Sequence, residues 1–222
     1  MARPSHNTDR MLIKAAKQLL PATGVSGLKL RRVADKAGVN LGMFHYHFRS
    51  KDEFIKRVLV EIYGDFFSKF KIETSSSGSP LERLGSAVVS LGRFARDNRS
   101  LAFVIIRDIL GGRRDAARFA GKNFTGHIAV IAGLVEECRK NGSIINIPAP
   151  QAIAFIAGSI AFPNAVMEII DKSGAKKPLG ITREELAEQL LSDEAIDSRA
   201  ELVIRALTPP ARATHCRGKE KS

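Results

Sequence analysis

A cluster of histidine, tyrosine and methionine side chains at residues 43–47 is the part of the chain best suited to recognise a ligand. Phe44 and Phe48 are four positions apart, so in a helix they share one face. Tyr46 then points away from that face, with Met43 and two histidines beside it. Such a face offers hydrogen-bonding groups and an apolar contact, which suit the base edges, methyl groups and phosphates of nucleic acid.

Other chemistry is not indicated. His45 and His47 do not form a metal site, because residues i and i+2 of a helix diverge by about 200°. Cys138 and Cys216 have no second ligand at metal spacing, so neither a zinc site nor a disulfide framework is expected. The sequence has no G-x-S-x-G motif, no phosphate-binding loop and no recognisable nucleophile–base pair. We therefore expect no enzyme activity, no metal and no cofactor.

Three short helices are predicted to hold this face in place. Apolar residues at helical spacing predict a first helix that ends at Pro21 and Gly24, a second over 30–37 and a third over 40–48. Gly38 provides the turn between the last two, because glycine adopts a left-handed backbone without a steric cost. Two short helices that are joined by a tight glycine turn and packed on a preceding helix form a helix-turn-helix.

The rest of the chain is predicted to be helical as well. Ser50 and Glu53 form a capping-box pattern, which opens a fourth helix that continues to about residue 73. Further helices are expected at residues 81–97, 99–110, 113–141 (unbroken, or broken near Gly121), 149–172 and 182–207. The predicted fold class is therefore all-α.

The predicted organisation is an N-terminal three-helix head followed by a larger helical domain. The helix-turn-helix domain covers residues 1–50, and a ligand-binding and dimerisation domain covers 51–208, with 51–73 as its connecting helix. Residues 209–222 are predicted to form a disordered basic tail.

Positive charge is concentrated at the two ends of the chain. The whole chain has a formal net charge of +12, and residues 1–57 alone carry twelve Lys and Arg against four Asp and Glu. Residues 209–222 carry four against one, which leaves the middle of the chain close to neutral. A basic head on a near-neutral body is expected of a module that binds a polyanion.

Small, aromatic and basic residues of the head fall into a familiar register, at Ala15, Ala16, Gly24, Val33, Ala34, Ala37, Gly38, Val39, Asn40, Gly42, Phe44, Tyr46, His47, Phe48, Lys51 and Phe54. Through them the run from residue 10 to 54, about a fifth of the chain, resembles the DNA-binding head of the TetR-family regulators. The resemblance implies that DNA is contacted by Lys29, Leu41, Gly42, Met43, His45, Tyr46, His47 and Lys51. In that assignment Tyr46, His47 and Lys51 contact phosphate or sugar, and the residues at 41–43 and 45 face bases.

Two positions depart from the family pattern. The family usually has Thr or Ser to cap the second helix, where this chain has Leu28 and Lys29. Lys29 can still reach a phosphate, but the capping hydrogen bond is absent unless Ser26 supplies it. His45 replaces the family's usual tyrosine, so the contact there differs or titrates.

Aromatic residues and a histidine of the body are candidates to line an effector cavity, and these are Phe94, Phe103, Phe124, His127, Phe155 and Phe162. The alternative is that they are ordinary core residues. Residues 141–167 carry no charge, but prolines and polar residues interrupt them, so a helix buried against protein is expected rather than a membrane span. Small residues within 149–167, together with the helix at 182–207, predict a homodimer interface, and packing inside one subunit is the alternative.

These features together predict a cytoplasmic, homodimeric repressor that leaves a palindromic operator in double-stranded DNA when it binds a small-molecule effector. The first residues lack the apolar segment of a signal peptide, and no membrane partner is expected. The alternative function is a constitutive or architectural DNA-binding protein without an effector.

Overall fold

The computed structural model describes residues 7–75 and 77–210, and within them the side chains of 21, 22, 24–26 and 115 are not described. Its helices are α1 (Thr8–Gly27), α2 (Leu30–Ala37), α3 (Leu41–His47), α4 (Lys51–Thr74), α5 (Pro80–Asp97), α6 (Arg99–Leu110), α7 (Arg114–Asn123), α8 (Gly126–Lys140), α9 (Ala149–Ser173), α10 (Arg183–Leu191) and α11 (Asp193–Leu207), with a 3-10 turn at Pro178–Gly180. The described residues contain no strand, so the predicted all-α class is confirmed.

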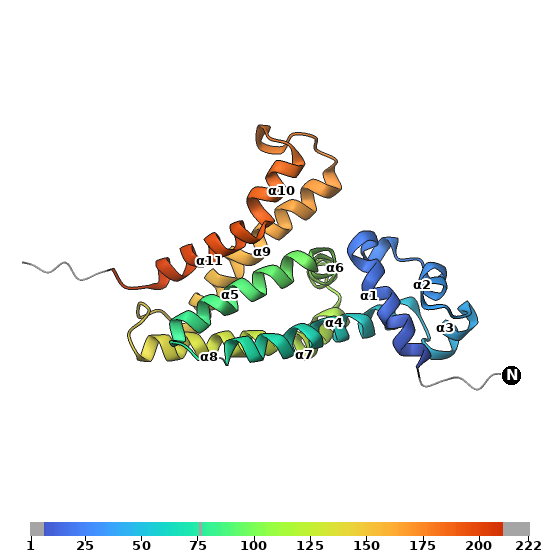
Figure 1. Ribbon diagram of the computed structural model, residues 1–222, viewed down its shortest axis with the longest axis horizontal. Coiled ribbons are helices and arrows are strands. Elements are labelled where there is room, and N and C mark those ends of the chain that lie inside the picture. The colour runs from blue at the N-terminus through green and yellow to red at the C-terminus, as the bar shows by residue number, and fades with distance from the viewer. Residues whose placement is uncertain (1–6, 76, 211–222) are drawn as a thin grey trace, which may run out of the picture.

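Helices α1–α3 and the start of α4 form a small head at one end of the molecule (Figure 1). Its core is made by the apolar faces that the sequence predicts, and Leu12, Val33 and Phe44 are fully buried. Leu101 of α6 belongs to the same cluster of buried residues. The head therefore packs against the body through a shared core, in addition to its connection through α4.

Helix α1 is longer than predicted. We expected Pro21 and Gly24 to end it, but the helix continues to Gly27, so this prediction is wrong. A proline removes one backbone hydrogen bond and is disfavoured in a helix interior. Leu20 and Leu28 are nonetheless buried in the head core on either side of this turn, so tertiary packing outweighs the local preference.

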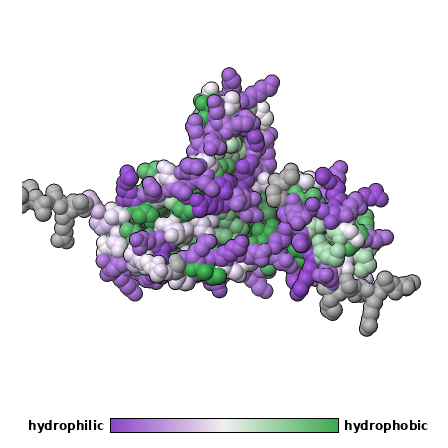
Figure 2. Space-filling model, in the orientation of Figure 1, coloured by the Kyte–Doolittle hydropathy of each residue, from purple (hydrophilic) through white to green (hydrophobic). Residues whose placement is uncertain are grey.

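Helix α4 leaves the head and runs along the body, where it packs against α5 and α8 (Figure 1). Ser50 caps it by accepting a hydrogen bond from the Glu53 amide over 3.1 Å, the first of the two bonds of the expected capping box. Helices α5, α8, α9 and α11 surround a second core, in which Leu84, Val135 and Ile156 are buried. The end of α9 and α10 rise from the body as an arm whose visible surface is mostly hydrophilic (Figure 2).

Two predicted helices are divided in the structure. The segment 113–141 breaks at Phe124 and Thr125, close to the expected break at Gly121. The helix predicted over 182–207 is not continuous, because Ser192 adopts an extended backbone and caps α11 through a hydrogen bond from the Ala195 amide. The basic tail predicted from residue 209 falls mostly at 211–222, outside the described residues.

Helix α9 is less buried than its composition predicts. Among the described residues it is the one helix long and apolar enough to cross a membrane by length and composition, and 28% of its most apolar window is buried in the protomer. One side contacts α5, α6, α8, α10 and α11. On the other side Phe155, Phe162 and Ile169 are 46%, 71% and 57% exposed. The expected burial against protein is therefore only partial within one chain.

Candidate DNA-binding head and effector-binding body

Helix α3 is fixed to the head by a cluster of three aromatic rings. Phe44 and Phe48 are buried, as their spacing predicts. Their ring centroids lie 5.0 Å and 4.8 Å from the ring of Phe54 on α4, at steep angles that suit edge-to-face packing. The start of α4 therefore sets the position of α3.

The turn before α3 is also well determined. Gly38 has φ +67°, in the left-handed region that favours glycine, and ends α2 there. Asn40 then caps α3 by accepting a hydrogen bond from the Gly42 amide over 2.8 Å. A Cβ atom at position 42 would come within 3.3 Å of the Asn40 side-chain oxygen, so the glycine leaves this cap undisturbed.

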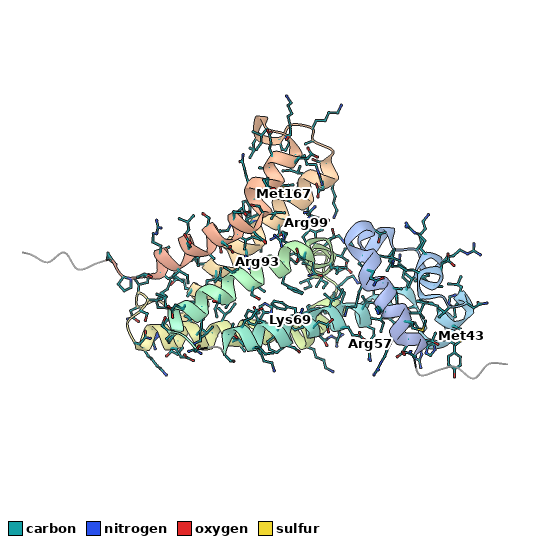
Figure 3. All side chains as sticks on the ribbon, in the orientation of Figure 1. Met43, Arg57, Lys69, Arg93, Arg99 and Met167 are labelled. Carbon is teal, nitrogen blue, oxygen red and sulfur yellow. The ribbon has the colours of Figure 1, made fainter. Side chains whose placement is uncertain are left out.

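The eight candidate DNA-binding residues lie at the start of α2, on α3 and at the start of α4. Four are exposed at the surface, namely Lys29, Gly42, His45 and Tyr46. Tyr46 is 69% exposed, so its ring and hydroxyl are accessible to a partner. Met43 lies on α3, at the end of the head that is far from the body (Figure 3). An exposed aromatic side chain on a rigid short helix is suited to contact DNA.

The other four candidates are half-buried: Leu41, Met43, His47 and Lys51. Leu41 packs against the head core. The Nε2 atom of His47 is shielded from solvent and has no hydrogen-bond partner among the described residues.

The N-cap of α2 lacks a Thr or Ser side chain, as the sequence indicates. Lys29 occupies this position with an extended backbone, and its side chain makes no capping hydrogen bond. The side chain of Ser26, the alternative cap, is not among those described. Exposed cations of the head lie on α1, on α2 and directly after α3, at Lys14, Arg31, Arg32, Lys36 and Arg49. These charges make the head suitable for a phosphate backbone.

In the body, three of the six predicted effector residues converge on Tyr63 of α4. The ring centroids of Phe94, Phe124 and His127 lie 6.4, 5.1 and 5.9 Å from that of Tyr63. The Tyr63 hydroxyl lies 3.1 Å from His127 Nδ1 and also accepts a hydrogen bond from the His127 amide. Burial raises the pKa of Tyr63 and lowers that of His127, so both are neutral near pH 7.

The other three predicted effector residues lie elsewhere. Phe103 on α6 has the ammonium of Lys172 3.8 Å above its ring centre. Phe155 and Phe162 are on the exposed side of α9. The structure therefore does not bring the six residues into one site.

Sequence analysis missed three aromatic residues of this cluster, Tyr63, Phe66 and Phe67, because α4 was interpreted only as a connecting helix. Phe66 stacks on Phe94 with centroids 3.9 Å apart. Gly126 allows α8 to approach α4 here, since a Cβ atom at that position would lie 2.6 Å from the Phe67 ring. The sequence does contain a signal for this cluster, because α4 carries three aromatic residues within five consecutive positions.

Two hollows of the body have walls suited to a ligand. The larger is an open groove of about 1250 Å³ between the end of α4, α5 and α11, where Figure 2 shows apolar surface among hydrophilic surface. The smaller, of about 260 Å³, lies between the start of α4, α6 and α7. The described residues contain no group of three or more His, Cys, Asp and Glu that could hold a metal ion.

Ion pairs and a hydrogen bond connect α5 and α6 with α9 and α11. Arg99 at the start of α6 donates to Asp171 of α9 over 2.5 Å, and Ser100 donates to the buried Glu168 over 3.3 Å. Figure 3 shows Arg99 beside Met167 at this junction. On α5, Arg93 bridges to Asp197 of α11 over 3.0 Å. These contacts join α5 and α6 to α9 and α11, the two helices on which Phe155, Phe162, Ile169 and Leu202 are exposed.

Comparison with known proteins places the fold and the head in one class, that of all-helical regulators with an N-terminal helix-turn-helix. Residues 12–58 match the family described as bacterial regulatory proteins, tetR family. The head of the chain is therefore similar to the DNA-binding domain of that family, over about a fifth of the chain. It is 29% identical over 83 residues to the HTH-type transcriptional repressor KstR2 of Mycolicibacterium smegmatis. That similarity covers 37% of this chain and only 40% of the repressor.

Solved structures share the fold over nearly the whole chain. The regulator FadR of Bacillus subtilis, in complex with stearoyl-CoA, is 16% identical with a TM-score of 0.64, over 89% of this chain and 98% of its own. A TetR transcription regulator of Haloarcula marismortui is 15% identical with a TM-score of 0.68, over 92% of this chain and 100% of its own. At such identities the likeness concerns the fold and not the ligand.

Proposed function

We propose that the protein is a cytoplasmic, ligand-responsive transcriptional repressor that binds a palindromic operator as a homodimer. The observation that carries the proposal is the exposed face of α3. Tyr46 and His45 project from a short helix that three packed aromatic rings hold in place. A recognition helix of this kind enters the major groove, while cations on neighbouring helices contact the phosphates.

The exposed apolar stripe of α9 supports the homodimer. Phe155, Phe162 and Ile169 are spaced seven residues apart, so they form one line along the helix. Leu202 on α11 is 57% exposed as well. Paired α9 and α11 helices from two protomers would bury these side chains in a four-helix bundle. Two heads on one dimer fit two half-sites separated by about one helical turn.

The aromatic cluster around Tyr63 supports a response to an apolar or amphipathic effector. It lies where α4, α5 and α8 meet, and α4 also positions α3 through Phe54. A molecule that separates these helices would move the start of α4. The FadR structure was solved with stearoyl-CoA, which supports an amphipathic effector for this fold. A coupling free energy of about 3 kcal/mol would change operator affinity more than a hundredfold.

Selection of bound sequences from random duplex DNA tests the proposal. The intact protein should recover a palindrome, whereas the double variant His45→Ala, Tyr46→Ala should lose or alter it. Both side chains are exposed, so their removal leaves the head core intact. The control Gln18→Ala removes an exposed side chain from α1 and should recover the same palindrome. Salt-sensitive binding without a consensus in every variant would contradict the repressor and favour an architectural protein.

A further inference from the structure

Two carboxylates of α9 hold the first residues of α6. Glu168 accepts a hydrogen bond from the Ser100 hydroxyl over 3.3 Å, and its Oε2 atom lies 3.8 Å from Nε of Arg99. Asp171, about one helical turn later on α9, accepts a hydrogen bond from the Arg99 guanidinium over 2.5 Å. The α6–α9 cluster consists of these four side chains, Arg99, Ser100, Glu168 and Asp171.

The Glu168 carboxylate is shielded from solvent, because only 8% of its side chain is exposed. A buried carboxylate is costly unless cations and hydrogen-bond donors surround it. Lys172 lies 3.0 Å from it and adds a second cation. A displacement of α6 along α9 would separate the buried charge from its partners, so the cluster favours one arrangement of the two helices.

The cluster lies directly beside the head. Leu101 follows Ser100 in α6 and is buried in the head core, and α6 packs against α1 as well as against α9. Figure 1 shows α6 between the head and α9. Neighbouring residues of α6 therefore contact the head core and α9, so a fixed α6 also fixes the head relative to α9.

Another ion pair that holds the head is more exposed. Lys17 of α1 pairs with Asp65 of α4, but 68% of the Asp65 side chain is exposed. Water and salt screen an exposed pair of this kind. The buried α6–α9 cluster is therefore the better candidate to hold the head in place.

Another side of α9 carries the exposed apolar stripe. Ile169 directly follows Glu168 and is 57% exposed, as part of the stripe proposed to face a second protomer. Consecutive residues of α9 therefore hold α6 and face the partner. In a homodimer, a connection between the two heads then passes through Leu101, Ser100 and Glu168 of each protomer.

We propose that Glu168 and Asp171 are positioning residues that fix the distance between the two heads of the homodimer, and that they thereby determine the half-site spacing of the operator. Each base pair between two half-sites adds about 3.4 Å and about 35° of rotation to their separation. An operator with a different spacing therefore forces a head to move relative to α9, against the contacts of the cluster.

This inference rests on the proposed function, and the distance between the heads tests it without DNA. Gln18, which is exposed on α1, is replaced by cysteine and spin-labelled. Cys216 is replaced by serine, whereas Cys138 stays because it is buried. Double electron–electron resonance then measures the distribution of head-to-head distances in the dimer.

The test variant is Glu168→Gln, Asp171→Asn, which removes two charges and keeps the shapes of the side chains. Its distance distribution should be broader than that of the parent protein, with unchanged helix content by circular dichroism. The matched control is Asp193→Asn, Asp197→Asn, because both carboxylates also pair with an arginine across two helices. That arginine is on α5, which contributes no residue to the head core, so the control should keep the parent distribution.

Operators with one base pair added or removed between the half-sites test the effect on recognition. By fluorescence anisotropy, the intact protein should bind the selected spacing at least about tenfold more tightly than the altered spacings, a factor within the usual range of coupling between sites. The test variant should lose most of this preference and should bind a single half-site as the intact protein does. A purely stabilising role of the cluster would leave the spacing preference unchanged.

Either an unchanged distance distribution or an unchanged spacing preference in the test variant would overturn the inference. If the test variant loses helix content, Ser100→Ala decides in its place, because it removes one hydrogen bond of the cluster and should change both readouts in the same direction by less. A protein that stays monomeric, or that recovers no palindrome, would contradict the proposed function itself. A dimer that recovers a palindrome but tolerates every spacing would overturn only this inference.

Discussion

Removal of the Phe162 side chain should weaken the homodimer. This side chain is 71% exposed in one protomer and lies in the middle of the apolar stripe of α9. Full burial of a phenylalanine side chain stabilises by about 1.5–3 kcal/mol. Covering the exposed part is therefore worth roughly 1–2 kcal/mol per protomer. A twofold axis places the residue in the interface twice, which gives roughly 2–4 kcal/mol, or about 30- to 1,000-fold in the dimer dissociation constant.

Analytical ultracentrifugation of Phe162→Ala over a range of concentrations measures this change. Leu110→Ala is the matched control, because Leu110 is a large apolar side chain on α6, 82% exposed and outside the stripe. The control should keep the dissociation constant of the intact protein, and circular dichroism should report unchanged helix content in both variants. Equal dimerisation of both variants would contradict the α9 interface, since α9 would then be covered by something other than a second protomer.

Two further predictions concern the head and the body. Lys29→Ser should supply the missing cap of α2 and raise the free energy of unfolding by about 1 kcal/mol. The same change should lower operator affinity and the salt dependence of binding, because a phosphate contact is lost. Unchanged DNA affinity would show that Lys29 does not contact the DNA backbone. Burial holds the pKa of His127 below its ordinary value, so the unfolded chain takes up the proton first as the pH falls below about 6.5. Urea unfolding between pH 7 and 5 should therefore show a loss of stability that is smaller in His127→Gln, and equal losses in both proteins would refute a buried neutral histidine.

The head could be predicted from sequence because its local signals agree with one another. Gly38 and the spacing of Phe44 and Phe48 predict α2 and α3, the Ser50 cap predicts the start of α4, and the structure has each of them. The exception is the end of α1, where Pro21 is a local stop signal. Leu20 before the proline and Leu28 after it are both buried in the head core, and the sequence around Pro21 does not reveal that the packing holds the helix through this point.

The body was predicted less completely because its packing joins distant residues. Phe94 and His127 could be selected as aromatic or titratable, but their meeting at Tyr63 depends on how α4, α5 and α8 cross. Phe162 is an aromatic residue of a helix like Phe94, so the sequence does not distinguish the two, but Phe162 lies on the exposed side of α9. The break at Ser192 did have a local signal, since a serine followed by two acidic residues is typical of a helix start.

The most direct test of a dimeric operator-binding protein is a hydroxyl-radical footprint on the palindrome recovered by selection. Two protected regions related by twofold symmetry are expected, with centres about one helical turn apart. Lys51→Ala should reduce protection in both halves equally, because each protomer contributes the same contact. One protected region, or continuous protection without symmetry, would contradict a dimer in which two α3 helices contact the operator together.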